Sequence, residues 1–358
     1  MKKVAILNFQ YTTKNYGAVL QAAALEHTCR KLGHEAWHLD YIGKPRFSLK
    51  SEVGQLLRKL GLRRTPKAQR VANKKTFERF RNGFIKRTQR IQSPREFSAI
   101  ASEFDAAIVG SDQVWRPAFA IDALAFFLGY VPQGIDRIAY AASFGTASWE
   151  QIENTVLTEA VRRELKLFKA ISCREDSGVE ICKDVFGVEA AHVLDPLLLV
   201  DGQFFHNILG KSSRKSSANL IYYKLDSSPE FVQDLEVISS DFGSDAVNIY
   251  FKNSNVLAFN EVPDWLTMIL DAEVVITDSF HCICLALRFG KEVIFCPNEK
   301  RGRTRLDSLF RMFDIELEQL AIDLKTPMFK LVGHGDINAI LEKQRLKSIE
   351  FLSEALNG

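Results

Sequence analysis

The stretch Val274-Val275-Ile276-Thr277-Asp278-Ser279-Phe280-His281 is followed directly by the apolar run Cys282-Ile283-Cys284-Leu285-Ala286-Leu287. The first apolar run is typical of a buried parallel strand, and the second is typical of the apolar face of a helix. Polar side chains therefore stand where a strand ends and a helix begins, which is where open α/β sheets bind ligands. The unpaired N–H groups of such a helix suit a phosphate or a carboxylate. The same residues equally allow Asp278 or Ser279 to cap the helix, with His281 packed inside its first turn.

The strand–loop–helix pattern recurs along the chain. A predicted strand over 3–9 leads through a polar loop to a predicted helix over 18–32, and a second strand follows at 36–41. Alternation of this kind builds doubly wound sheets. Further strands are predicted at 104–109, 137–142, 170–173, 218–224, 246–250 and 292–296, and further helices at 150–168, 229–239, 263–270, 305–313 and 336–356.

The alternation divides into two parts at residues 201–217, which are rich in Gly, Lys, Ser and Asn and are typical of a linker. We expect an N-terminal Rossmann-like domain over 1–200, a C-terminal Rossmann-like domain over 201–335, and a helix over 336–358 that packs back on the N-terminal domain. The predicted fold class is α/β, with two domains facing a cleft. This arrangement resembles the two-domain glycosyltransferase architecture called GT-B, although alternation alone does not separate it from other paired Rossmann-like folds.

The composition is that of a soluble globular protein, with 358 residues of which 46% are hydrophobic and 25% charged. No apolar run is long enough to span a bilayer, and the run after Lys3 is too short for a signal peptide. The six cysteines form no Cys-x-x-Cys pair. We therefore expect a cytoplasmic protein with reduced thiols, without a disulfide framework, a zinc site or any other metal.

Positive charge is concentrated in residues 44–95, which hold 17 Lys or Arg against only Glu52 and Glu78. Because the whole chain has a net charge of +3, the remainder is net negative. Such a stretch favours an anionic membrane surface or another polyanion, and it equally suits a solvated pair of helices. It lacks the aromatic and glycine pattern of a nucleic-acid module, so we expect no nucleic-acid partner. Phe77, Phe80, Phe84 and Ile85 are spaced to line the core face of its second helix.

Several polar residues at predicted strand ends are candidates for a site. Arg174 carries a planar fork that bonds two oxygens of a carboxylate or phosphate, or else forms a salt bridge with a neighbouring acid. Asp112 suits general acid or base chemistry or a sugar hydroxyl, while Gln113 and Trp115 suit a sugar by hydrogen bond and by stacking. The alternative is a capped turn in which Trp115 is buried.

The loop before the first helix has no Gly-x-Gly-x-x-Gly and no Walker lysine, so it predicts neither a dinucleotide site nor a P-loop. Its Gly17 allows a ligand or a backbone to approach closely. Asn15 fits the role of a plain helix cap at least as well as a role in ligand binding.

Several segments in order resemble the polysaccharide pyruvyl transferase family over residues 1 to about 315. The first is Asn15-Tyr16-Gly17-Ala18-Val19-Leu20-Gln21, which is similar to the family's N-x-G-A-x-L-Q signature. The others are Phe104–Trp115, Tyr140–Gly145, Cys173-Arg174-Glu175, Val193–Pro196 and Ile276–His281. The resemblance implies transfer of a pyruvyl group from phosphoenolpyruvate to two hydroxyls of a sugar, which gives a cyclic ketal and phosphate.

By this resemblance, Arg174 and His281 match positions that hold phosphoenolpyruvate. The chain departs from the family at Ser279, where some members have an arginine, and at Cys282, where relatives often have glycine. The missing positive charge would have to come from Arg301, Arg303 or Arg305.

The resulting hypothesis makes His281 the acid that protonates the donor's methylene carbon, because histidine titrates near neutrality. Asp112 would be the base, and Asn15 and Gln113 would orient the sugar. The substrate-binding set is completed by Arg174, Gly17, Ser143, Asp278, Ser279, Arg303 and Arg305. We expect no cofactor besides the donor substrate. The acceptor would be a lipid-linked sugar at the inner membrane face, which residues 44–95 would contact peripherally.

Two other functions fit the same sequence. The chain would be a GT-B glycosyltransferase if its donor were a nucleotide sugar, which Ser279 in place of an arginine slightly favours. It would be a non-catalytic partner in polysaccharide assembly if the site bound neither donor.

Overall fold

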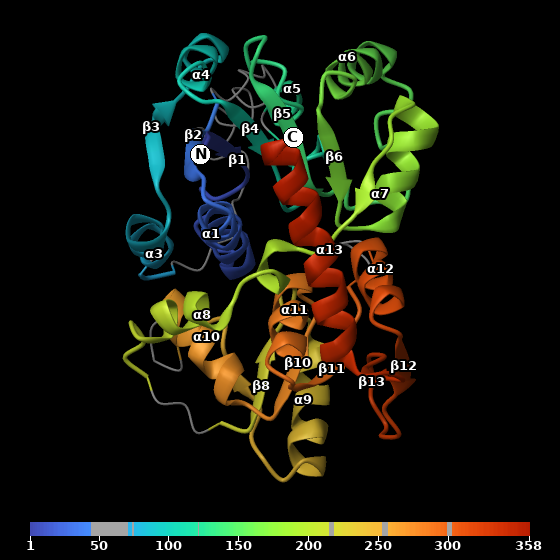
Figure 1. The fold of residues 1–358 in the computed structure, drawn as a ribbon. Helices are drawn as coiled ribbons and strands as arrows, with labels where there is room; N and C mark the ends of the chain where they lie inside the picture. Colours follow the sequence, from blue (N-terminus) through green and yellow to red (C-terminus); the bar gives the residue numbers. More distant parts are fainter. Residues whose placement is uncertain (44–70, 74, 121, 215–217, 253–256, 299–302) are drawn as a thin grey trace, which may run out of the picture.

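The computed structural model describes residues 1–43, 71–73, 75–120, 122–214, 218–252, 257–298 and 303–358. Two α/β domains lie one above the other in Figure 1, each built on its own sheet. Most of the basic stretch 44–95, namely residues 44–70 and 74, lies outside the described residues, as does Arg301. The predicted membrane contact of that stretch therefore stays a prediction.

The N-terminal domain contains a sheet of seven parallel strands in the order β3-β2-β1-β4-β5-β6-β7. This is the doubly wound order, in which the chain starts in the middle and winds outward in both directions. The strands are β1 (Lys3–Leu7), β2 (Glu35–Tyr41), β3 (Arg87–Ile91), β4 (Ala106–Val109), β5 (Asp136–Ala142), β6 (Ala170–Cys173) and β7 (Ala191–His192).

The helices of this domain follow the strands that they connect. They are α1 (Tyr16–Lys31), α3 (Thr76–Phe84), α4 (Pro94–Ala101), α5 (Ala123–Phe126), α6 (Thr155–Leu165) and α7 (Asp176–Ile181), which continues as the π-helical turn η1 (Cys182–Phe186). The short 3-10 turn η2 (Pro196–Leu198) and α8 (Gly202–Leu209) lead into the next domain.

The C-terminal domain contains six strands in the order β12-β13-β11-β10-β8-β9. The four strands β8 (Leu220–Tyr223), β9 (Val247–Asn248), β10 (Val274–Thr277) and β11 (Glu292–Phe295) are parallel, and β13 (Phe329–Gly333) and β12 (Ile315–Gln319) extend the sheet with antiparallel pairing. The helices are α9 (Pro229–Asp241), α10 (Val262–Asp271), α11 (Phe280–Arg288), α12 (Thr304–Met312) and α13 (Ile337–Asn357).

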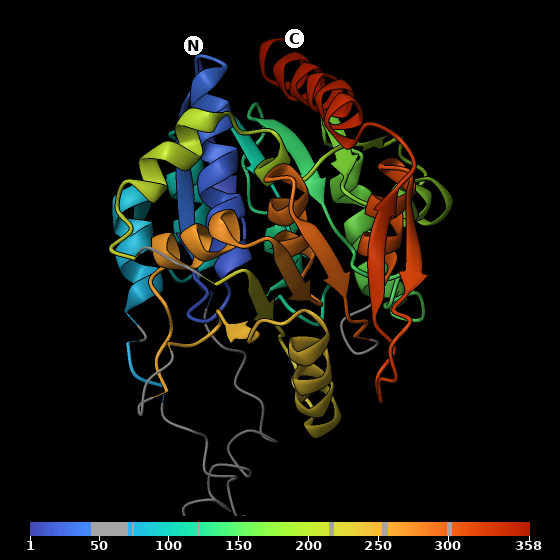
Figure 2. The ribbon, with the colours of Figure 1, turned by 90° about the horizontal axis from the view of Figure 1, so that it is seen from below.

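Alternate residues of β10 pack on opposite faces of the C-terminal sheet. Val274 and Ile276 join the apolar cluster under α9, whereas Val275 joins the cluster that contains α10 and α11. Figure 2 shows α9 on one side of the sheet with α10 and α11 on the other. The strand is thus buried on both faces, which is why its sequence is continuously apolar.

The two domains share one apolar core. The cluster that contains Ile6 of β1 and Leu20 of α1 also contains Trp265 of α10 and Ile283 of α11. Tyr16, at the start of α1, stacks on Trp265 with ring centroids 4.7 Å apart. A large apolar contact of this kind fixes the relative position of two domains more firmly than a polar one.

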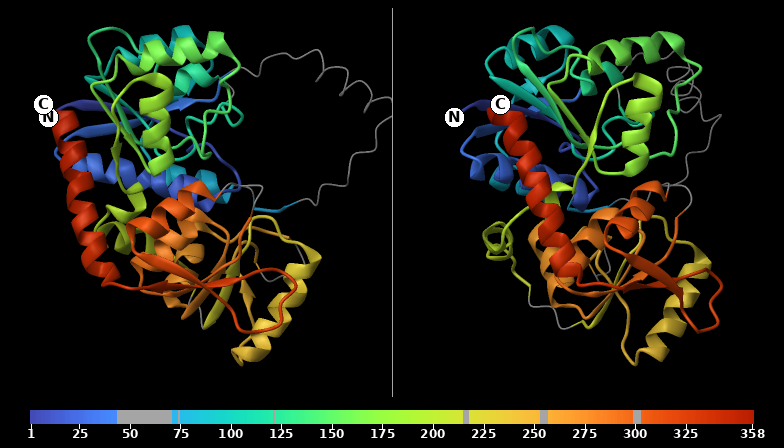
Figure 3. Two further views of the ribbon diagram at one scale, coloured as in Figure 1. Left: turned by 90° about the vertical axis from the view of Figure 1, so that its right-hand side faces the viewer. Right: turned by 45° about the vertical axis from the view of Figure 1, so that its right-hand side comes forward.

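Helix α13 runs alongside both domains, as Figures 1 and 3 show from several sides. Its Ser348 hydroxyl accepts the amide of Leu194 at 3.0 Å, and Arg345 donates to the carbonyl of Leu199 at 2.7 Å. Leu352 on the same helix is fully buried in the shared core. The helix therefore fastens the end of the chain against the segment that leaves the N-terminal domain.

The α/β class, the paired Rossmann-like domains and the GT-B-like arrangement are confirmed. The local prediction of a linker over 201–217 is wrong for residues 202–209, which form α8 because Phe204, Phe205 and Ile208 find a core to pack on. In the basic stretch, the predicted aromatic helix is α3, but residues 87–91 form the edge strand β3. The antiparallel pair β12–β13 is a further feature that the sequence pattern did not indicate.

Replacing Leu352 by alanine should lower the free energy of unfolding by about 2–5 kcal/mol, because it leaves a cavity in the shared core. The matched control is Leu346→Ala on the same helix, where the side chain is 63% exposed and the effect should stay within about 0.5 kcal/mol. Urea denaturation measures both values, and equal effects would contradict the proposed packing of α13.

Candidate functional site

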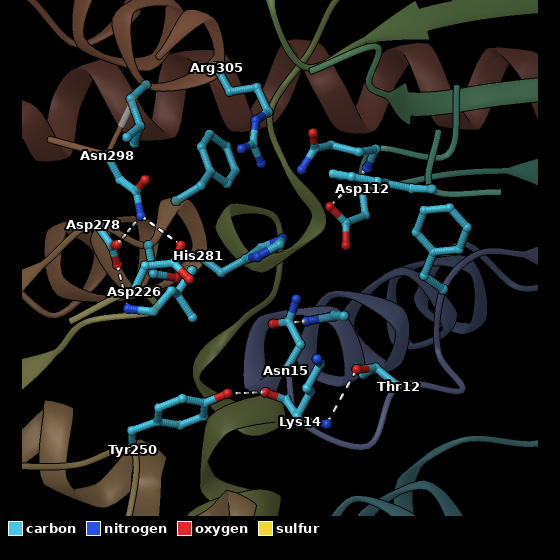
Figure 4. Close-up of a pocket in the computed structure, with 18 of the residues that line it drawn as sticks. Thr12, Lys14, Asn15, Asp112, Asp226, Tyr250, Asp278, His281, Asn298 and Arg305 are labelled. Carbon is cyan, nitrogen blue, oxygen red and sulfur yellow. Dashed lines mark hydrogen bonds between the residues drawn. The ribbon is translucent and has the colours of Figure 1, made fainter. Parts of the chain in front are cut away.

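A cavity of about 720 Å³ lies between the two domains. Its walls come from the segments that follow β1, β4, β8, β10 and β11, all at the carboxyl ends of parallel strands. Figure 4 shows Arg305, His281, Asp112 and Asn15 around this space, with Asp226, Asp278 and Asn298 on the opposite side from Asp112. The cavity thus occupies the place where doubly wound sheets bind ligands.

The turn between β10 and α11 brings His281 to the cavity. The Thr277 hydroxyl donates to the carbonyl of Tyr223 at 2.7 Å and accepts the amide of Ser279 at 3.0 Å. Ser279 then caps α11, since its hydroxyl accepts the amide of Cys282 at 3.5 Å. The sequence left a capping role and a site role open, and the structure combines them, because His281 follows the cap and lines the cavity.

Gly17 is needed for the close approach of α1 to His281. A Cβ atom on this glycine would lie 2.3 Å from His281 Nδ1 and 2.4 Å from Cγ. Real Cβ atoms do not come so near, so the imidazole ring occupies the space of the missing side chain. The group that comes close to Gly17 is thus the imidazole of His281. Gly17 is not among the residues that line the cavity.

Arg174 joins the polar groups of the two domains. One of its terminal nitrogens, Nη2, donates to Asp112 Oδ1 at 3.0 Å, and the other, Nη1, donates to Asp195 Oδ2 at 2.9 Å. His281 Nε2 lies 3.2 Å from the second of these nitrogens and 3.5 Å from the same Asp195 oxygen. Arg174 is buried and does not line the cavity. It holds the carboxylates and the histidine in place, so it forms salt bridges of the kind that the sequence left open, and its predicted contact with a ligand stays a prediction.

Burial and charge act in opposite directions on the carboxyl groups of this network. Burial alone would raise the pKa of Asp112, but Arg174, a protonated His281 and Arg305 lower it overall. The pKa of Asp195 is lowered as well, because His281 and Arg174 outweigh the effect of its burial. Both carboxylates therefore stay ionised, and the pKa of Arg174 is raised by them in spite of its burial.

Positive groups meet at the cavity from both domains. Lys14 comes from the loop after β1, while Arg303 and Arg305 come from the start of α12. Burial, and then repulsion by Arg174, lowers the pKa of Arg305 to about 10. A guanidinium whose charged form is destabilised in this way would be stabilised by a bound anion.

The side of the cavity opposite Asp112 is acidic and polar. Asn298 donates to Asp226 Oδ2 at 2.9 Å and to Asp278 Oδ2 at 2.8 Å, and Asp278 Oδ1 accepts the amide of Leu225 at 2.9 Å. Lys224 lies 3.4 Å from Asp278 Oδ2. The predicted binding residue Asp278 thus lines the cavity, already engaged with its neighbours.

The other predicted residues divide into cavity-lining and supporting groups. Asn15 and Gln113 line the cavity, and Asn15 also caps α1 by accepting the amide of Ala18 at 3.2 Å. Ser143 is buried behind the wall, where its hydroxyl donates to Glu175 Oε1 at 2.9 Å. Trp115 is fully buried and donates to the carbonyl of Phe126, so it cannot stack on a ligand.

Sequence reasoning gave no role to Asp195 or to Asn298. Asp195 stands in Val193–Pro196, one of the segments that carry the family resemblance, and that was the available signal. Asn298 had none, because only the folded chain brings it between Asp226 and Asp278. Arg81 was also missed as a site residue. Its guanidinium donates to the carbonyls of Gln10 and Thr12, which fastens the loop after β1.

A family model for polysaccharide pyruvyl transferase matches residues 15–300, most of the chain. The chain belongs to the polysaccharide pyruvyl transferase family. The resemblance expected from its motifs is confirmed, and membership places the chain among transferases. A comparison with curated protein sequences gives no significant match.

Solved structures give distant similarities. The S. aureus protein MnaA with UDP is 11% identical, with 99% of this chain and 91% of that one covered and a TM-score of 0.48. UDP-GlcNAc 2-epimerase from Methanocaldococcus jannaschii is 10% identical, with 97% and 99% covered and a TM-score of 0.46. The strand order and the connections of the present chain establish its fold.

Neither a metal-binding group nor a membrane-spanning helix is found in the described part of the chain. Its residues include no group of three or more His, Cys, Asp or Glu placed to hold a metal ion. None of its helices is long and apolar enough to cross a membrane.

Replacing Gly17 by alanine should destabilise the protein and displace the His281 ring, although alanine in a helix normally gains about 1 kcal/mol over glycine. Gly83→Ala in α3 is the matched control, because a Cβ there meets nothing within 4 Å and the ordinary gain should appear. Urea denaturation measures the two signs, and the NMR signal of the imidazole reports its displacement. A stabilising Gly17→Ala with an unmoved ring would contradict the packing.

Proposed function

We propose that the protein transfers the pyruvyl group of phosphoenolpyruvate to two hydroxyls of one sugar, within the biosynthesis of a capsular, extracellular or cell-wall polysaccharide. The observation that carries this proposal is the buried Arg305 guanidinium, which lines the same cavity as His281. Phosphoenolpyruvate has a carboxylate and a phosphate, and Arg305, Lys14 and Arg303 supply positive charge for both. Arg305 thereby takes the part that an arginine at position 279 has in some relatives.

His281 is the proposed acid. Protonation of the donor's methylene carbon forms a methyl group and makes the central carbon electrophilic, so that a sugar hydroxyl attacks it. The bond from that carbon to the phosphate oxygen breaks, phosphate leaves with the electron pair, and the second hydroxyl closes the ketal. The two sugar hydroxyls release two protons. One replaces the proton that the new methyl group has taken up, and the other goes to the released phosphate.

Asp112 is the proposed acceptor of a hydroxyl proton. Because its pKa is lowered overall, it is ionised and able to accept a hydrogen bond from the attacking hydroxyl. A lowered pKa also makes it a weak base, so its main contribution is to orient the hydroxyl and to favour its attack. Asn15 and Gln113, which line the cavity, are the proposed partners of the other sugar hydroxyls.

Arg174 is a positioning residue in this proposal. It keeps Asp112 and Asp195 apart at a fixed spacing and places a positive charge beside His281 Nε2. Removal of Arg174 would take the guanidinium partner from two buried carboxylates, and breaking a buried ion pair typically costs about 3–5 kcal/mol of stability. Arg305, by contrast, would contact the donor directly.

A nucleotide-sugar donor is the second candidate, and the pair Asp226 and Asp278 favours it. Carboxylates at the edge of a cavity accept hydrogen bonds from ribose or sugar hydroxyls. The same pair repels an anion, so a phosphoenolpyruvate carboxylate would bind away from it. The two donors therefore predict different ligands for the cavity.

Thermal denaturation with each donor tests the choice between the two functions. Phosphoenolpyruvate should raise the midpoint of thermal denaturation and UDP or GDP should not, and phosphate should be released when phosphoenolpyruvate is mixed with lipid-linked or nucleotide sugars.

His281→Gln should lose nearly all phosphate release while keeping its fold. Arg305→Ala should raise the KM for phosphoenolpyruvate, and Arg174→Ala should lose both activity and stability.

The control for these variants is Arg311→Ala, which removes an exposed arginine paired with Asp176 away from the cavity. It should leave phosphate release unchanged. Stabilisation by UDP alone would favour the glycosyltransferase, and stabilisation by neither ligand would favour a non-catalytic partner in polysaccharide assembly. Normal release by His281→Gln would refute the assigned acid.

The proposed acceptor is a lipid-linked sugar, with the basic stretch 44–95 in peripheral contact with anionic lipid. Reversing several lysines and arginines within 44–70 should then weaken binding to vesicles that contain phosphatidylglycerol, and added salt should weaken it further. Vesicle sedimentation measures the bound fraction. Unchanged binding by the charge-reversed variant would remove the membrane from the proposal.

A further inference from the structure

An exposed aromatic ring stands at the wall of the cavity on the N-terminal domain. Phe119 lines the cavity and is 49% exposed. Trp115, the aromatic residue that the sequence suggested for stacking on a sugar, is fully buried. A large apolar side chain left half exposed beside a binding cavity is a feature that ligand contact explains, whereas scattered surface residues need no explanation.

The Phe119 ring is held in place by Arg116. The guanidinium carbon of Arg116 lies 4.6 Å from the centroid of the Phe119 ring, and the amide of Phe119 donates to the Arg116 carbonyl at 2.9 Å. Arg116 is in turn fixed by Glu150, to which its Nη2 donates at 2.7 Å. A cation over one face restrains the ring, so little conformational entropy is lost when a ligand covers its free surface.

Hydrogen-bonding groups lie next to this ring in sequence and in the cavity wall. Gln113 lines the cavity, and its Oε1 lies 3.4 Å from Arg116 Nη1. Gly145 makes room for it, because a Cβ on that glycine would lie 2.1 Å from the same Oε1 atom. Asp112 lines the same wall as an ionised acceptor. The wall thus combines one aromatic face with an amide and a carboxylate.

This combination fits a pyranose ring better than it fits the proposed donor. A pyranose has an apolar face of C–H groups, which can cover an aromatic ring. The hydroxyls at its edge can donate hydrogen bonds to a carboxylate and can both donate to and accept from an amide. Phosphoenolpyruvate has no such face, and its charges call for cations. Arg116, the cation beside Phe119, is already paired with Glu150.

We infer that Phe119 is the platform on which the sugar acceptor stacks, with its hydroxyls directed to Gln113 and Asp112. The inference deepens the proposed function, on which it rests for the reaction but not for sugar binding itself. It makes Phe119 a specificity-determining residue that contacts the acceptor and not the donor. Substitution of Phe119 should therefore affect one substrate only.

Saturation-transfer NMR with neutral methyl glycosides tests the stacking without a reaction. The probes are methyl β-galactoside, methyl β-glucoside and methyl α-mannoside, with UMP as a competing kind of ligand. The ring C–H protons of at least one glycoside should receive saturation from the native protein. Phe119→Ala should weaken that binding about two- to tenfold, the range for one aromatic contact. Phe119→Tyr should keep it.

The matched control is Phe242→Ala, which removes a partly exposed phenylalanine that follows α9 and does not line the cavity. It should leave the glycoside signals unchanged. Where phosphate release is measurable, Phe119→Ala should raise the KM for the acceptor and leave the KM for phosphoenolpyruvate as it was. A rise in both KM values would indicate a merely structural role and overturn the inference.

The two proposals fail in different ways. Glycoside signals that depend on Phe119, without binding or turnover of phosphoenolpyruvate, would remove the donor and keep the platform. Phosphate release together with glycoside signals that ignore Phe119 would remove the platform and keep the reaction. Absence of any glycoside signal from the native protein, or UMP signals that depend on Phe119 in place of glycoside signals, would also overturn the platform.

Discussion

The buried guanidinium of Arg174 is the contact on which the site depends. It comes from the end of β6 and bonds Asp112 after β4 and Asp195 before η2, and it lies against His281 from the other domain. Two carboxylates at this depth require a cation between them, because an unpaired buried charge is costly. The need to pair charge in the core thus sets the spacing of the groups that face the cavity. A substitution at Arg174 would therefore disturb Asp112, Asp195 and His281 together.

The apolar contact between the domains makes this polar network possible. Gly17 lets α1 approach α11 so closely that the imidazole of His281 fills the space of a side chain. Tyr16 beside it stacks on Trp265, and its hydroxyl donates to the carbonyl of Asn260 at 2.9 Å. These contacts leave His281 little freedom to turn. The signature Asn15-Tyr16-Gly17 is therefore explained by packing at the domain contact as much as by contact with a ligand.

Local sequence patterns predicted the parts of the fold that local physics determines. Apolar runs ending in polar turns gave the parallel strands, the order of the two domains and the positions of His281 and Asp112 at strand ends. Features that depend on distant partners were missed. Residues 202–209 look like a linker until Phe204, Phe205 and Ile208 meet a core, and the edge strand β3 has only one neighbour to hold it. Arg174 was assigned to a ligand or to a salt bridge with a neighbouring acid, and its observed partners Asp112 and Asp195 were missed because they are distant along the chain.

Charge and apolar surface are distributed unevenly inside the cavity. Of the cations at the cavity, Arg303 and Arg305 belong to the C-terminal domain and Lys14 belongs to the N-terminal domain. The N-terminal domain also supplies the exposed ring of Phe119 and the hydrogen-bonding Gln113. His281 and Asp112 line the cavity from the two domains (Figure 4), and Arg174 bonds Asp112 and lies against His281. Under the proposed function, an anion bound at the cations and a sugar stacked on the ring would meet near His281 and Asp112, which line the same cavity. If the proposed function holds, this placement of charge would also set the side from which the sugar reaches the donor.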